Sequence, residues 1–144
     1  MRSYTSLRIA LGLSCIGPLI EGAAALISGE LVIKLYEITA RSSVTLTPEL
    51  NFLFKPLGLY LVMYGGLLAY AMINPERDRT IILWGALLSF LRVIQRLFLT
   101  PTLHELFKVP VWISLVQIAW LSVLTIALFV LRPRRASVPS VALE

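Results

Sequence analysis

The 23 residues from Val109 to Leu131, VPVWISLVQIAWLSVLTIALFVL, contain no charged side chain. An α-helix of that length, rising about 1.5 Å per residue, crosses the roughly 30 Å hydrocarbon core of a lipid bilayer. A second uncharged run covers the 18 residues Pro56–Ile73. Both segments therefore predict membrane-spanning helices.

Two further apolar segments have the length of a span but carry charges. Thr80–Leu99 contains Arg92 and Arg96, and Ile9–Gly29 contains Glu21. A short polar turn, residues 74–79, separates two of the four segments, and short connections favour antiparallel neighbours. We predict an all-α integral membrane protein, an antiparallel four-helix bundle in residues 1–131 with spans at about 9–29, 54–73, 80–99 and 109–131, followed by a flexible basic tail, 132–144.

The composition supports this fold class and excludes others. Hydrophobic residues make up 58% of the 144, far above the soluble average, and the formal net charge is +5. Apart from Arg92 and Arg96, the basic residues are scattered among the ends of apolar segments, which argues against a nucleic-acid partner. Cys15 is the only cysteine, so an intrachain disulfide and a cysteine-based metal site are excluded.

Lysine and arginine collect at cytoplasmic ends of membrane helices, and their distribution predicts the orientation. With both termini cytoplasmic, that side holds more of them than the outer side does. The cytoplasmic set is Arg2, Arg8, Arg77, Arg79, Arg132, Arg134 and Arg135, and the outer set is Lys34, Arg41, Lys55 and Lys108. We expect a multi-pass protein of a bacterial inner (cytoplasmic) membrane.

The connections differ in character. Glu30–Ile38 mixes charges with large apolar residues, so it is either a helix along the membrane interface or an extension of the first span. Arg41–Pro48 has the β-branched residues of a loop or short strand. Pro101 and Pro110 bracket the third connection, which places His104 in an outer loop, too far out to ligate a haem in mid-membrane.

Charges inside the bilayer need partners or a purpose, because each costs about 2.5–3.5 kcal/mol on insertion scales. Glu21 lies 13 residues beyond Arg8, and Arg92 lies 13 residues beyond Arg79. Both therefore lie roughly 20 Å from the cytoplasmic ends of their helices, and an ion pair between them is geometrically possible.

Other polar side chains fall near the same depth. They are Arg96, Gln117, Tyr60 and Tyr64. Three readings stay open: a structural layer in which polar groups and an ion pair fix which helices adjoin, a ligand pocket in the outer half of the bundle, or a proton or ion path. In the pocket reading the two arginines recognise an anionic head group or carboxylate, and Glu21 holds Arg92 in place.

Small residues mark one face of the second span. Gly58, Gly65 and Ala69 lie opposite the tyrosines and allow another helix to approach closely, either inside the bundle or from a neighbouring protein. No motif for phosphate binding, metal binding or nucleophilic catalysis occurs, which argues against hydrolase and kinase chemistry.

The order of these features resembles the DoxX-like group of small four-span bacterial membrane proteins. The resemblance rests on Leu7–Gly12 (LRIALG), Lys55–Tyr60 (KPLGLY) and Asn74–Arg79 (NPERDR) and covers most of residues 5–130. Some members of that group accompany quinone-linked oxidoreductases, so the resemblance implies an accessory-subunit role by analogy.

The leading expectation is a non-catalytic accessory or structural subunit of a larger bacterial energy-transducing or respiratory-type membrane complex. It holds no metal or cofactor by its own ligands, contacts lipids and other membrane subunits, and leaves quinone or pigment contact open. The alternative is a lipid or small-molecule binding membrane protein with a pocket in its outer half, with an isomerase-like enzyme as one form.

Overall fold

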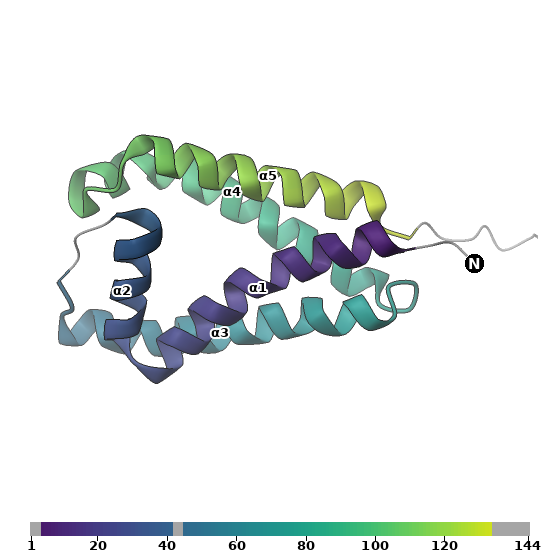
Figure 1. Ribbon diagram of the computed structural model, residues 1–144, viewed down its shortest axis with the longest axis horizontal. Coiled ribbons are helices and arrows are strands. Elements are labelled where there is room, and N and C mark those ends of the chain that lie inside the picture. The colour runs from purple at the N-terminus through teal and green to yellow at the C-terminus, as the bar shows by residue number, and fades with distance from the viewer. Residues whose placement is uncertain (1–3, 42–44, 134–144) are drawn as a thin grey trace, which may run out of the picture.

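The computed structural model describes residues 4–41 and 45–133, and within them every regular element is an α-helix (Figure 1). The elements are α1 (Thr5–Ile27), α2 (Gly29–Ala40), α3 (Pro48–Ile73), α4 (Arg79–Phe107) and α5 (Val111–Leu131). All but α2 are long and apolar enough to cross a membrane. The predicted all-helical protein with four candidate spans is confirmed. Residues 134–144, most of the predicted tail, lie outside the described residues.

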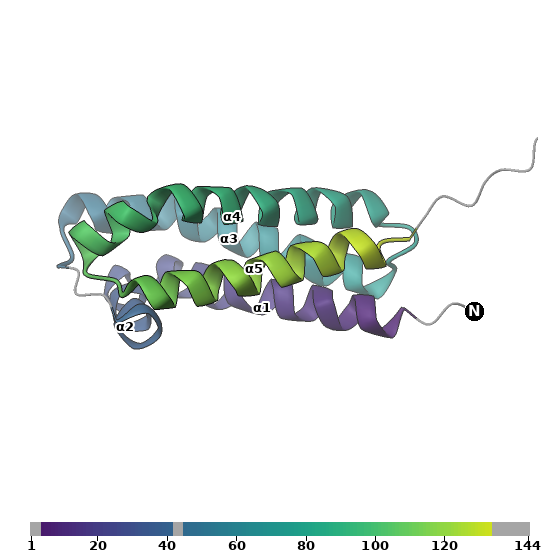
Figure 2. The ribbon, with the colours of Figure 1, turned by 90° about the horizontal axis from the view of Figure 1, so that it is seen from above.

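The four long helices lie along the long axis of the molecule, and α2 runs across it (Figure 1, Figure 2). The start of α1, the α3–α4 turn and the end of α5 lie together at one end, which we call the terminal end. The connection from α4 to α5 and the start of α3 lie with α2 at the opposite end, which we call the α2 end.

Ser28 separates α1 from α2. Its backbone is extended (φ −155°, ψ 136°), which ends α1, and its hydroxyl accepts a hydrogen bond from the Glu30 amide at 3.2 Å. A serine at this position satisfies one of the free amides at the start of the next helix. Glu30–Ile38 therefore belongs to a helix separate from α1 and is not an extension of the first span, while its place at a membrane interface stays a prediction. The helix α2 ends at Ala40, and the next residue, Arg41, has a left-handed backbone (φ 49°).

The third helix begins earlier than predicted. Thr47 caps it by accepting a hydrogen bond from the Leu50 amide at 3.2 Å, and Pro48 occupies the first turn. Proline suits that position because its missing amide would have no helical partner there. The expected loop or strand therefore ends at Thr47. Its residues 42–44 lie outside the described residues, and the described ones around them form no strand.

The placement of the third connection was wrong. Pro101 lies inside α4, which continues to Phe107, so the connection is short and the helix carries His104. Membrane helices tolerate an internal proline because neighbouring groups re-satisfy the freed backbone atoms. His104 Nδ1 lies 3.1 Å from the Val109 carbonyl oxygen, across the connection to α5.

Two apolar clusters hold the ends of the bundle. The larger lies towards the terminal end and draws on all four long helices: Leu7, Ala10, Leu11, Cys15, Tyr64, Leu68, Ala71, Ile82, Ala86 and Leu128. The smaller lies at the α2 end, where Ala40 packs on Val109 and Ile113 with Tyr36 against them. The space between the two clusters contains the candidate site.

Glycines bring α1 and α3 into close contact, the most extensive between any two helices. A Cβ atom added to Gly58 would lie 2.8 Å from the Ala25 Cβ, and one added to Gly65 would lie 2.7 Å from the Leu19 Cγ. Ala69 is partly buried against the larger cluster. Of the two readings of this small-residue face, packing inside the bundle is the one found.

The outer surface of the long helices is apolar. Large hydrophobic side chains are at least half exposed on every one of them, including Ile16 on α1, Met63 on α3, Phe98 on α4 and Val130 on α5. Monomeric soluble proteins do not expose apolar surface on this scale. The surface suits contact with lipid and agrees with a multi-pass membrane protein.

Candidate functional site

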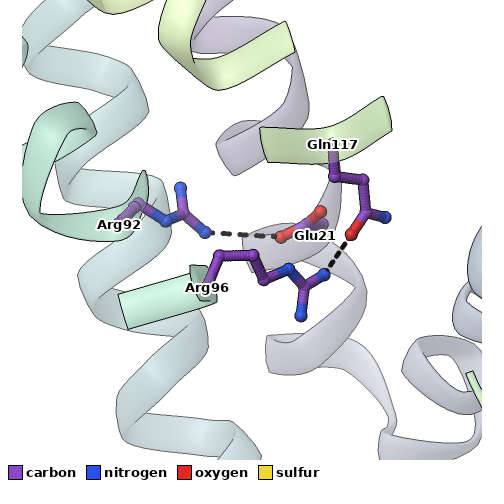
Figure 3. Close-up of polar contacts among 4 residues, drawn as sticks. All are labelled: Glu21, Arg92, Arg96 and Gln117. Carbon is purple, nitrogen blue, oxygen red and sulfur yellow. Dashed lines mark hydrogen bonds and ion pairs between the residues drawn. The ribbon is translucent and has the colours of Figure 1, made fainter. Parts of the chain in front are cut away.

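A cavity of about 460 Å³ lies in the bundle, walled by α1, α2, α4 and α5 with Tyr64 of α3. Its volume is in the range of small-molecule sites, which is about 300–1,000 Å³. Polar and charged side chains concentrate at one level of it, and four of them are drawn in Figure 3: Glu21, Arg92, Arg96 and Gln117. Along each of α1, α4 and α5, these four side chains lie between the residues of the larger cluster and the α2 end, where the smaller cluster lies.

Glu21 and Arg92 form the predicted ion pair. Arg92 Nη2 lies 3.9 Å from Glu21 Oε2, and the side chains are 34% and 35% exposed, respectively (Figure 3). The pair bridges α1 and α4, whose backbones are not closely packed against each other. Since 3.9 Å is longer than a charge-assisted hydrogen bond of about 2.7–2.9 Å, both groups keep hydrogen-bonding capacity towards the cavity.

Arg96 has a different partner. One turn along α4 from Arg92, its guanidinium donates a hydrogen bond to Gln117 Oε1 on α5 (Figure 3). Gln117 is neutral, so this contact orients Arg96 without neutralising its charge. The sequence predicted that Arg96 and Gln117 share a layer with the ion pair, and the structure brings all four side chains together.

The two tyrosines of α3 have separate environments. Tyr64 is buried at the cavity wall, where its hydroxyl lies 3.1 Å from the Gly85 carbonyl and 2.9 Å from the Ser89 hydroxyl. Tyr60 stacks on Tyr64 at a centroid distance of 6.3 Å, but it is 46% exposed on the outer surface and does not line the cavity. The structure thus brings Tyr64 to the candidate site and leaves Tyr60 outside it.

The helix α2 supplies residues that sequence reasoning missed. Leu35, Tyr36 and Thr39 line the cavity from the α2 end. Burial, followed by the negative charge of Glu21, raises the pKa of the Tyr36 phenol above its usual value, so the phenol stays neutral. The signal was present in the sequence as Glu30–Ile38, but only the turn at Ser28 directs this helix across the bundle.

Groupings of metal-ligating side chains do not occur in the part of the chain that the structure describes. No three His, Cys, Asp or Glu residues there lie close enough to hold an ion. Cys15 is buried in the larger cluster and donates to the Gly12 carbonyl at 3.1 Å, and His104 is on the exposed side of α4. The charged and polar side chains of the cavity can recognise a ligand by charge and hydrogen bonds.

Comparison of the chain with protein-family models, with curated proteins and with solved structures gives no match in any of the three. The resemblance to the DoxX-like group stays a prediction.

Proposed function

We propose that this protein is a multi-pass membrane protein whose cavity binds a small molecule with a negatively charged group. In this proposal the long helices form an antiparallel bundle across a bacterial inner membrane with both termini in the cytoplasm. The terminal end then faces the cytoplasm, the side to which the distribution of lysine and arginine along the sequence assigns both termini. The α2 end, and with it the cavity, belongs to the outer half of the bilayer.

One observation carries the proposal: two arginines reach the cavity from one helix face, and within the described residues only Arg92 has an acidic side chain at ion-pair distance. A purely structural polar layer needs no second positive charge, because the charges of Glu21 and Arg92 already neutralise each other. An arginine held on a neutral glutamine inside a membrane bundle is costly and points to a role in recognition. Guanidinium groups suit carboxylate and phosphate oxygens in both charge and geometry.

The accessory-subunit role has less support. One argument for that role was the small-residue face of α3. This face is covered by α1 within the chain and is not free for a neighbouring protein. The apolar outer surface is equally suited to lipid. Membership of a larger respiratory-type complex and an isomerase-like activity therefore stay predictions, without a feature of the cavity that favours them.

Native mass spectrometry of the protein purified in mild detergent tests the proposal. We expect a co-purified anionic molecule on the wild-type protein and on a Lys34→Leu control, which removes an exposed positive charge of α2 outside the cavity. The adduct should be lost from Arg96→Leu, with the helical circular dichroism unchanged. Equal adducts on the Arg96→Leu variant would refute the proposal, and a stoichiometric protein partner in place of the adduct would favour the accessory-subunit role.

A further inference from the structure

We propose that the ligand is an amphiphile of the outer leaflet, with a head group that carries one negative charge and an acyl chain that leaves the cavity towards the middle of the membrane. This inference rests on the proposed function and names the class of ligand. Three observations lead to it: the charge of the cavity, the state of its hydroxyl groups and the position of its apolar wall.

The first observation is the charge. Among the described residues that line the cavity, the acidic and basic side chains are Glu21, Arg92 and Arg96. The carboxylate offsets one of the two arginines, which leaves one positive charge. A single negative charge on the ligand neutralises the site, whereas a second one would face Glu21 without a partner, in an environment where unpaired charges are costly.

The second observation is that four hydroxyl groups of the wall, those of Ser14, Thr39, Tyr64 and Ser89, already take part in hydrogen bonds. Ser14 donates to the Ala10 carbonyl at 2.8 Å, Thr39 donates to the Leu35 carbonyl at 2.7 Å, and Ser89 is bonded to Tyr64. Among the described wall residues, the Tyr36 phenol is the one hydroxyl without such a bond, so a sugar or another polyhydroxylated ligand would find few free hydroxyl donors there. The guanidinium groups are the strongest donors that face the cavity, so a compact group of oxygen acceptors fits best.

The third observation is the apolar wall, which begins one turn beyond the polar level. Along α5, Gln117 is followed by Trp120, Leu121 and Leu124, all lining the cavity on the way to the terminal end. Along α1, Leu13 and Gly17 line the same stretch opposite them. A chain attached to a head group at Arg96 therefore has an apolar path along α1 and α5 leading away from the α2 end, beside Ser14, Ser89 and Tyr64, whose hydroxyl groups are already hydrogen-bonded.

The depth of the polar level agrees with an amphiphile in the outer leaflet. Gln117 is six residues into α5 from its start at Val111, about 9 Å along the helix axis. Trp120 is 50% exposed although it lines the cavity, so the wall reaches the lipid-facing surface at this residue. The head group then lies below the outer surface with its chain directed to mid-membrane, the orientation of a lipid in that leaflet.

Two kinds of molecule share this chemistry: a long-chain carboxylate and a lipid phosphodiester. Trp120 provides a reporter for both, because bromine atoms on a bound acyl chain quench a nearby indole. The experiment uses the full chain with Trp84 and Trp112 replaced by phenylalanine, in nanodiscs of phosphatidylcholine. The probes are dibromostearate, dibrominated phosphatidylglycerol, the methyl ester of dibromostearate and a dibrominated alkyl phosphate with close to two charges at pH 8.

We expect saturable quenching by dibromostearate, by dibrominated phosphatidylglycerol or by both, and the probe that quenches identifies the source. The neutral ester and the doubly charged phosphate should bind at least tenfold more weakly, and Arg96→Leu should lose the saturable component. Glu21→Gln raises the charge of the cavity by one and should reverse the preference in favour of the doubly charged probe. Glu30→Gln, on an exposed residue of α2 outside the cavity, is the matched control and should change nothing.

Calorimetric titration with acetate and inorganic phosphate separates this inference from the proposed function. Tailless anions that bind in an Arg96-dependent way as tightly as the long-chain probes would overturn the amphiphile and leave the proposed function standing. A doubly charged probe that binds wild type as well as the singly charged ones, or an unchanged preference in Glu21→Gln, would overturn the single-charge argument. Absence of Arg96-dependent binding by every anion would overturn both.

Discussion

Removing the acidic partner of Arg92 tests the physics of the cavity directly. At the observed N–O distance of 3.9 Å, two unit charges attract each other by about 1 kcal/mol in water and about 4 kcal/mol at an effective dielectric constant of 20. Both side chains are about one third exposed, so screening reduces the larger figure. We expect a coupling free energy of about 2 kcal/mol between Glu21 and Arg92, below the 3–5 kcal/mol that breaking a fully buried pair costs.

A double-mutant cycle measures this coupling free energy. Glu21→Gln, Arg92→Met and the double variant are unfolded reversibly by sodium dodecyl sulfate in mixed micelles, with helical circular dichroism as the signal. The double variant should be destabilised by about 2 kcal/mol less than the sum of the two single variants. The control cycle pairs Arg92→Met with Glu30→Gln and should be additive within about 0.5 kcal/mol. Additive effects in the first cycle would refute the ion pair as a source of stability.

Three further predictions concern the packing that frames the cavity, and the same unfolding assay measures each. Gly58→Ala should destabilise by about 1–3 kcal/mol because the new methyl group meets α1, whereas Gly66→Ala, which meets nothing within 4 Å, should be neutral or slightly stabilising. Tyr64→Phe should cost about 1 kcal/mol through its lost hydrogen bonds to α4, and Tyr60→Phe should cost less than half of that. Lys55→Met should cost about 1 kcal/mol, because the Lys55 ammonium donates to two carbonyl groups at the end of α1.

The sequence predicts the four long helices well because the signal is strong and local. Uncharged runs such as Val109–Leu131 exceed the thickness of a bilayer, and that length alone identifies the helix. The ends are less predictable. Pro101 ends a helix in most soluble proteins but is carried inside α4, and Pro48, assigned to a loop, opens α3. A proline can end a helix, open one or lie inside one, and the surrounding tertiary structure decides which of these occurs.

Of the candidate site, the sequence predicts the depth of each side chain along its helix and little more. Counting residues from the helix ends places Glu21, Arg92 and Gln117 at one level, and the structure brings them together. The same count places Tyr60 there too, but depth does not specify rotation about the helix axis, and Tyr60 faces outward. The contribution of Tyr36 depends on the direction that α2 takes after Ser28, which no local pattern specifies.

The pairing of α1 with α3 has a consequence for how the protein is built. Gly22 contacts Gly58 across that interface, while the neighbouring Glu21 points into the space that α4 later borders. During synthesis α1 and α3 are made before α4, so the carboxylate enters the bilayer well before its cation exists. An unpaired carboxylate in the bilayer costs free energy. We expect the nascent chain to bear this cost until Arg92 emerges from the ribosome, so that neutralisation of the Glu21 charge is a late step of membrane insertion.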